Sequence, residues 1–169
     1  MSGKGGYKSN ITDNIEEAVL NKDLVWVTTP AHCFPKIASM ISPYVKEGQY
    51  IGIVPGSGGA EFAFHEVIEK GAVLFGLQRV HSVARLKEYG HSVYALGGKS
   101  EIYIGSIPED YSIKICELAG ELFDLPCIPL SSYLDVTFSP SNQIIHTARI
   151  YCMFKDYHRG VKYKENFLF

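Results

Sequence analysis

The chain has 169 residues, of which 46% are hydrophobic and 20% are charged, and its formal net charge is −2. This composition is typical of a globular domain with its own core, and the charge argues against electrostatic binding to nucleic acid or to a membrane. No apolar run approaches the roughly 20 residues that cross a bilayer, and residues 1–10 lack the apolar core of a signal peptide. We therefore expect a cytoplasmic protein that binds neither nucleic acid nor membrane.

The four cysteines are Cys33, Cys116, Cys127 and Cys152, and none forms a CxxC pair. Their spacing does not match that of a zinc site, so we expect no bound metal. Without a secretion signal, reduced thiols are expected, and each cysteine is most simply interpreted as a small buried apolar residue.

The first half of the chain alternates amphipathic stretches with short apolar runs. Helices are predicted at 12–21, 34–46 and 58–70, and buried strands at 24–28, 50–54 and 72–77. Thr12 is a candidate N-cap for the first helix, and Gly71 is expected to end the third. This alternation indicates βαβ units, and therefore a parallel sheet in a doubly wound α/β layer.

The pattern changes after residue 80. Strands are predicted at 81–89, 91–96 and 101–107, and the last two, joined by residues 97–100, are expected to form a hairpin. A helix at 110–123 and a short strand at 125–130 follow. From Ser139 a long helix runs to Tyr157, with Ser141 or Asn142 as its cap. A domain junction is expected between Ser131 and Ser139.

Two loops follow predicted strands and are candidates for ligand binding. Residues 28–32 include Thr29, Pro30 and Ala31, and residues 55–59 begin with Pro55 and Gly56. Loops beyond the carboxyl ends of parallel strands line the ligand crevice of doubly wound sheets, and a following helix N-terminus favours an anion. A glycine after a strand is nevertheless more often a simple turn.

A third candidate lies on the last predicted helix. Asn142, His146 and Arg149 are spaced so that they project from one helix face. An imidazole suits proton transfer near neutral pH, and a guanidinium can hold a substrate carboxylate through two hydrogen bonds. Taken alone, such a face is more often an ordinary polar surface.

Residues 134–151, with the core Pro-Ser-Asn-Gln-Ile-Ile-His-Thr-Ala-Arg, closely resemble the opine dehydrogenase family (octopine and nopaline dehydrogenases). Pro30-Ala31-x-x-Phe34 and Val54-Pro55-Gly56-x-Gly58-Gly59 resemble the cofactor-side loops of that family. The resemblance runs from about residue 12 to residue 169, and the Asn-x-x-x-His segment is its specific part.

The resemblance implies a fold and a reaction. The fold would be a partial Rossmann-like doubly wound sheet (1–131) followed by the start of an all-α C-terminal domain (132–169). The reaction would be reductive condensation of an α-keto acid, typically pyruvate, with an amino acid, using NADH or NADPH. By the resemblance His146 is the catalytic acid/base, Asn142 matches a residue on the same face, and Arg85 matches an arginine of the substrate-side loop. We expect Asn142, Arg85 and, from its guanidinium, Arg149 to contact substrate. The loops of Thr29, Pro30, Ala31, Pro55 and Gly56 are expected to contact the cofactor.

The sequence departs from the family in several places. Gln143 replaces a proline, and 81–84 replace a Pro-aromatic-Ala-Cys run near the amino-acid substrate. The family's downstream aspartate lies beyond the chain, and neither Asp135 nor Asp156 matches its position. A strand–GxGxxG–helix unit is absent, because Gly3-Lys4-Gly5-Gly6 follows no strand. The chain is therefore interpreted as a fragment that is inactive alone.

Two alternatives remain open. One is a non-catalytic interaction or regulatory fragment, whose uncovered sheet edge would favour self-association. The other is a relative acting on a 3-hydroxy acid or a polyol phosphate. Those enzymes use a lysine on the corresponding helix, and this chain has no lysine between Lys114 and Lys155.

Overall fold

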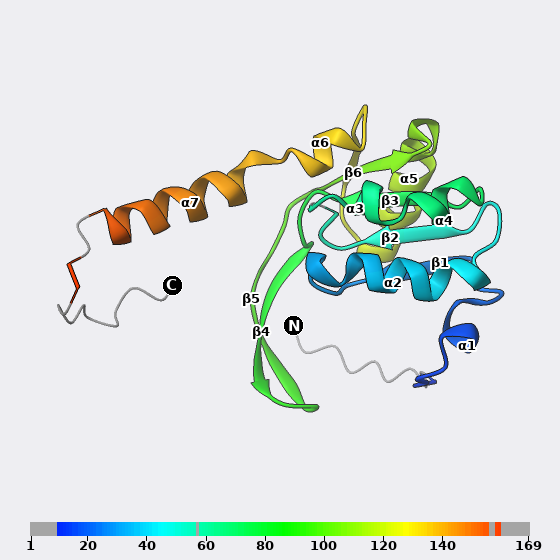
Figure 1. Cartoon of the computed structure of the whole chain (residues 1–169), viewed down its shortest axis with the longest axis horizontal. Coiled ribbons are helices and arrows are strands. Elements are labelled where there is room, and N and C mark those ends of the chain that lie inside the picture. Colours follow the sequence, from blue (N-terminus) through cyan, green and yellow to red (C-terminus); the bar gives the residue numbers. More distant parts are fainter. Residues whose placement is uncertain (1–9, 57, 156–157, 160–169) are drawn as a thin grey trace. The chain divides into compact units, whose positions relative to one another are not determined.

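The computed structural model describes residues 10–56, 58–155 and 158–159, and of residues 140–143 only the backbone. The chain divides into two compact units between Phe138 and Ser139, and each is described by itself. The first unit is a sheet with helices on both faces, and the second contains one long helix (Figure 1). Residues 3–6 and Asp156 lie outside the described residues.

Among its described residues, the first unit has six α-helices: α1 (Ile15–Val19), α2 (Phe34–Ile41), α3 (Ala60–Ala63), α4 (His65–Glu69), α5 (Ser112–Phe123) and α6 (Leu134–Thr137). Its strands are β1 (Leu24–Val27), β2 (Tyr50–Ile53), β3 (Val73–Leu77), β4 (Ser82–Glu88), β5 (Ser92–Gly98), β6 (Ile102–Ile107) and β7 (Cys127–Pro129). Short 3-10 helices span Ala31–Cys33, Ser42–Tyr44 and Glu109–Tyr111. Helix α7 (Pro140–Phe154) belongs to the second unit.

The main sheet has the strand order β1-β2-β3-β6-β7. Strands β1, β2 and β3 are parallel, as the alternating pattern predicts. Strand β6 is antiparallel to β3, with Leu77 opposite Ile104, and β7 runs parallel to β6. The predicted Rossmann-like α/β class is confirmed, with one reversal of direction inside the sheet.

The predicted hairpin of 91–96 with 101–107 is wrong. Strand β5 pairs instead with β4, through a turn that contains Gly90 at φ +73°, and the two extend from the sheet as an arm (Figure 1). Strand β6 is mostly buried, whereas β4 and β5 are mostly exposed. The apolar run of β6 therefore gains more burial inside the main sheet than beside β5.

The helix starts differ from the predicted caps at two places. Asn14, not Thr12, caps α1, because its side-chain oxygen accepts a hydrogen bond from the Glu16 backbone N–H at 3.0 Å. Ser139 stands at the N-cap of α7 and Pro140 at its first position, so Ser141 and Asn142 lie inside the helix. The helix ends at Phe154, and residue 157, where its end was predicted, lies outside the described part of the chain.

The sheet separates two apolar clusters because successive strand residues face opposite sides. Leu74 lies in one cluster, with α1 to α4, and Phe75 lies in the other, with α5. The Trp26 ring meets the Phe75 ring edge-on at a centroid distance of 5.1 Å. Fully buried side chains such as Phe34, Phe64 and Ile115 each stabilise the fold by about 1.5–3 kcal/mol.

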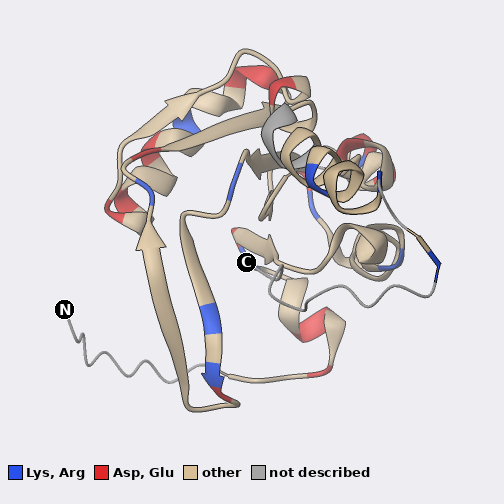
Figure 2. Ribbon diagram, turned by 90° about the vertical axis from the view of Figure 1, so that its left-hand side faces the viewer, with Lys and Arg blue, Asp and Glu red and all other residues tan. Residues whose placement is uncertain are grey.

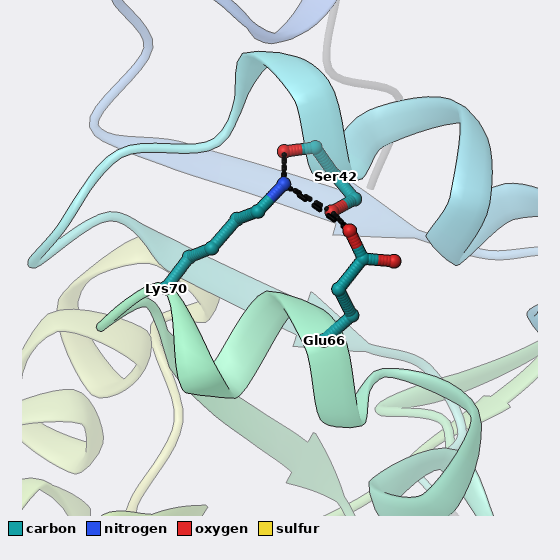
Figure 3. A network of polar contacts seen from close by, with 3 residues as sticks. All are labelled: Ser42, Glu66 and Lys70. Carbon is teal, nitrogen blue, oxygen red and sulfur yellow. Dashed lines mark hydrogen bonds and ion pairs between the residues drawn. The ribbon is translucent and has the colours of Figure 1, made fainter.

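A polar network joins α4 to the 3-10 turn after α2 (Figure 3). The buried Ser42 hydroxyl donates to a Glu66 carboxylate oxygen at 2.7 Å, and Lys70 Nζ donates to the Ser42 carbonyl at 2.8 Å. Lys70 also pairs with Glu66 at 3.3 Å. These contacts, led by the Ser42 hydrogen bond, lower the pKa of Glu66.

The cysteines also differ from the prediction. Cys116 on α5 and Cys127 on β7 form a disulfide bond, while Cys33 and Cys152 are free. The close packing of α5 on β7 brings the Cα atoms of Cys116 and Cys127 to 5.1 Å, within the range that a disulfide requires. The expectation of reduced thiols is therefore wrong for this pair.

Candidate functional site

The two predicted cofactor loops lie side by side. They follow β1 and β2, and because these strands are parallel, both loops leave the same edge of the sheet. A Cβ atom built on Gly58 would come within 2.8 Å of the Ala31 Cβ, so the loops are in direct contact. Gly58, at φ +96°, has a backbone conformation that other residues rarely adopt. This edge is the position where doubly wound sheets bind ligands.

The loop after β1 contains a hydroxyl group without a partner among the described residues. Thr29 Oγ1 is buried and accepts or donates no hydrogen bond there. Pro30 stands at the start of the 3-10 turn, where its carbonyl accepts from the Cys33 N–H at 2.9 Å. Ala31 is the first residue of that turn. A buried hydroxyl of this kind is available to a bound polar group.

The loop after β2 is held by contacts on both sides of Gly56. The Gly56 N–H donates to the Leu77 carbonyl at 2.8 Å, and the Gly56 carbonyl accepts from the Tyr133 hydroxyl at 3.0 Å. Burial raises the pKa of the Tyr133 phenol, with a smaller contribution from the charge of Glu61. Tyr133 therefore keeps its proton and acts as a permanent donor to this loop.

Tyr133 and Val136 rest on three glycines from neighbouring parts of the sheet, which we call the glycine seat: Gly56, Gly76 and Gly105. A Cβ on Gly76 would come within 2.8 Å of the Tyr133 hydroxyl, and one on Gly56 within 2.8 Å of Val136 Cγ1. Gly76 and Gly105 are partners across β3 and β6. The seat brings the 133–136 segment against the backbone of the sheet.

A second contact joins α6 to α3. The Thr137 hydroxyl donates to a Glu61 carboxylate oxygen at 2.8 Å. The other Glu61 oxygen is buried and has no partner among the described residues. Beside α3, a pocket of about 490 Å³ is lined by Ala31, Gly58 and Gly59 of the loops and by Phe34 and Phe62 of the helices.

The remaining predicted site residues lie elsewhere. Arg85 lies on β4, exposed and opposite Tyr94, and its guanidinium donates to the Ala84 carbonyl at 3.1 Å. Figure 2 shows the basic positions along this arm. His146 and Arg149 are exposed on α7 in the second unit, and Asn142 lies on the same helix, with its side chain outside the described part. The catalytic and substrate roles of these residues stay predictions.

Sequence reasoning missed Tyr133 and the pocket beside Gln78, Arg79 and Lys99. The available signal was the placement of Gly76 and Gly105 within apolar strands, since glycine there marks a close approach of backbone. In the parts of the chain that are described, no group of three or more potential ligand side chains could hold a metal ion. No helix there is long and apolar enough to cross a membrane.

The sheet order, the flanking helices and the two loops define a Rossmann-like α/β fold. No family model matches the chain. In sequence it is 27% identical over 143 residues to the protein y4xO of Sinorhizobium fredii, covering 80% of this chain and 38% of that protein. It is 29% identical over 93 residues to octopine dehydrogenase of Pecten maximus, covering 53% of this chain and 23% of that enzyme.

Solved structures of octopine dehydrogenase agree with this likeness. The complex with NADH and L-arginine has a TM-score of 0.76 at 23% identity, covering 92% of this chain and 40% of that one. The complex with NADH and pyruvate has the same TM-score at 22% identity. The predicted resemblance to opine dehydrogenases and the Rossmann-like α/β fold that it implied are confirmed, and the division into domains stays a prediction. The chain spans less than half the length of these relatives.

Proposed function

We propose that this chain supplies the second half of the NAD(P)-binding domain and the start of the catalytic domain of an opine dehydrogenase. The intact protein would condense an α-keto acid such as pyruvate with an amino acid and reduce the product with NADH or NADPH. The observation that carries the proposal is the likeness to octopine dehydrogenase over 92% of the chain, combined with two touching loops at the sheet edge.

The loops at the sheet edge would hold the cofactor, which supplies the hydride. Thr29 has a buried hydroxyl ready to bond to a polar group. Gly56 is buried, and its N–H and carbonyl bond to Leu77 and Tyr133, so it would act by positioning the second loop. Pro30, Ala31 and Pro55 shape the two loops around them. The octopine dehydrogenase structures of this fold contain NADH, which supports a nicotinamide nucleotide as the ligand.

His146 would act as the acid/base at the keto oxygen and the amine. Its exposed imidazole lies one helical turn from Arg149, whose guanidinium suits a substrate carboxylate. Asn142 and Arg85 would complete the substrate contacts. The related structures hold L-arginine, agmatine and pyruvate, which supports amino compounds and keto acids as the substrate class.

The proposed domain boundary follows residue 131, whereas the compact units divide between Phe138 and Ser139, because Tyr133 packs in the core of the first unit. The proposed location is the cytoplasm. Self-association of the isolated chain is proposed through the outer edge of β1, which pairs with no other strand of the described residues. Light scattering on the purified chain tests this, and a strictly monomeric chain would contradict it.

Substitution in the intact protein tests the catalytic assignment. His146→Ala is expected to lower turnover of pyruvate and an amino acid by about 10²–10⁴-fold, with NADH affinity unchanged, because only proton transfer is removed. His65→Ala is the matched control, since His65 is exposed on α4 and pairs with Glu69. Equal turnover in His146→Ala and wild type would refute the catalytic role.

The 169-residue chain tests the claim that this portion is inactive alone. NADH oxidation is followed with pyruvate and each amino acid in turn, and we expect no turnover, because the downstream aspartate and the glycine-rich phosphate loop are not in this sequence. Measurable turnover would contradict the proposal that this portion of the enzyme is inactive alone. Quenching or enhancement of NADH fluorescence on the same samples separately tests cofactor binding.

A further inference from the structure

A polar pocket lies at the base of the β4–β5 arm, on the same sheet edge as the cofactor loops. It has a volume of about 350 Å³ and is lined by the loop after β3 and the turn before β6. Because β6 runs antiparallel to β3, the end of one strand and the start of the other meet there. The parallel strands β1 and β2 also end at this edge.

Backbone hydrogen bonds hold the two walls of the pocket together. The Gln78 N–H donates to the Tyr103 carbonyl at 2.9 Å, and the Lys99 N–H donates to the His81 carbonyl at 2.8 Å. The Gln78 side chain reaches the Asp135 carbonyl at 3.3 Å, which ties one wall to α6. The pocket is thus built from two segments that are fixed to each other.

The charged side chains of this pocket favour an anion. Arg79 and Lys99 contribute two positive charges, and Glu101 contributes the only negative charge of the lining. The Tyr103 hydroxyl donates a hydrogen bond to the Glu101 carboxylate, so part of that acceptor is already occupied. A guanidinium and an ammonium in one pocket lining provide the charged donors that a carboxylate binds.

We propose that Arg79 and Lys99 form a carboxylate-binding site, which in the proposed reaction receives the carboxylate of the α-keto acid. The assignment rests on the proposed function for the choice of pyruvate. The pocket alone supports the general chemistry of the site, in which two cations beside the cofactor loops hold a small oxyanion. A phosphate group of the cofactor presents the same oxygens, so the experiment includes inorganic phosphate.

The test is a titration of the 169-residue chain with sodium pyruvate at low ionic strength, followed by amide chemical shifts. Saturable shifts are expected at residues 78–80 and 99–103. Arg79→Gln and Lys99→Gln should each weaken pyruvate binding by about 10-fold or more, since each removes a charged hydrogen-bond donor. Lys87→Gln is the control, because it removes the same charge from the exposed arm, where Lys87 lies over the Tyr94 ring.

Several outcomes would overturn the site. They are the absence of saturable shifts in the wild-type chain, an equal loss of affinity in Lys87→Gln, and binding of phosphate without binding of pyruvate. Competition between phosphate and pyruvate would support a shared oxyanion site, and a neutral amide analogue of pyruvate should not bind. NADH fluorescence separates the two proposals: NADH binding without pyruvate binding refutes this site and leaves the cofactor assignment standing.

Discussion

The segment 133–136 and helix α7 are close in sequence and opposite in environment. Tyr133 is 2% exposed and Val136 is fully buried on the glycine seat, whereas every described side chain of α7, from Ile144 to Phe154, is exposed. Packing therefore specifies the first segment, and backbone hydrogen bonds and intrinsic propensity specify the second. Substitutions in the glycine seat should therefore change stability, while those on α7 should change chemistry under the proposed function and leave the fold intact.

The largest effect is expected at the glycine seat itself. In Gly76→Ala the new Cβ would lie 2.8 Å from the Tyr133 hydroxyl and 2.9 Å from the Gly56 Cα. Because these neighbouring atoms are buried, we expect the free energy of unfolding, measured with urea, to fall by about 1–3 kcal/mol. Gly97→Ala is the control, since its Cβ would meet nothing within 4 Å. Equal urea midpoints for the two variants would show that close packing at the glycine seat does not stabilise the fold.

Tyr133→Phe should produce a smaller loss. It keeps the ring on the seat and removes only the donor to the Gly56 carbonyl. The expected decrease in unfolding free energy is about 1 kcal/mol, because a buried acceptor loses its partner. Tyr89→Phe serves as the control, because Tyr89 is 88% exposed on the arm. An unchanged urea midpoint for Tyr133→Phe would show that the hydroxyl does not hold the loop.

The network of Ser42, Glu66 and Lys70 predicts a modest dependence of stability on pH. The pKa of Glu66 is lowered in the folded protein, so its contribution is present above the ordinary value of 4.5 and is lost as the pH falls through the folded value. Glu66→Gln should flatten the fall in stability below pH 4.5, relative to wild type. Glu117→Gln, at an exposed position on α5, is the comparison. Identical acid profiles for wild type and Glu66→Gln would contradict this interpretation.

The smallest change in stability is expected on α7. His146 is exposed, and alanine favours helix, so His146→Ala should alter the unfolding free energy by no more than about 0.5 kcal/mol. Thermal unfolding of the variant measures this directly. A large loss would mean that the imidazole packs against other groups, and the contrast between seat and helix would fail.

Local patterns in the sequence located the strands of the parallel half. The apolar runs that became β1, β2 and β3 are short, buried and separated by amphipathic helices, so local sequence and fold agree there. The arm was mispredicted because Gly90 and the pair Gly97-Gly98 are both plausible turns, and only burial of β6 in the main sheet decides between them. Local patterns contain no information about that competition.

In the candidate site, too, local sequence predicts some features and tertiary packing decides the others. The loops that hold Thr29 and Gly56 could be predicted to lie side by side from their place after strands, because the carboxyl ends of parallel strands share an edge. The Tyr133 contact could not be predicted, since its partner Gly56 is 77 residues away. The contact also depends on close approach at Gly56 in the loop after β2, Gly76 in β3 and Gly105 in β6. The pairing of Cys116 with Cys127 likewise follows from packing of α5 on β7, which cysteine spacing alone does not reveal.

The reversed direction of β6 has a consequence for how the chain can vary. The polypeptide leaves the sheet after Leu77, and Ile104 of β6 pairs with that same residue. The segment that contains the arm therefore begins and ends at neighbouring positions of the sheet. A shorter or longer connection between β3 and β6 would leave the paired backbone of these two strands unchanged. Related proteins can therefore exchange this arm for another peptide of different length and chemistry, with the rest of the architecture conserved.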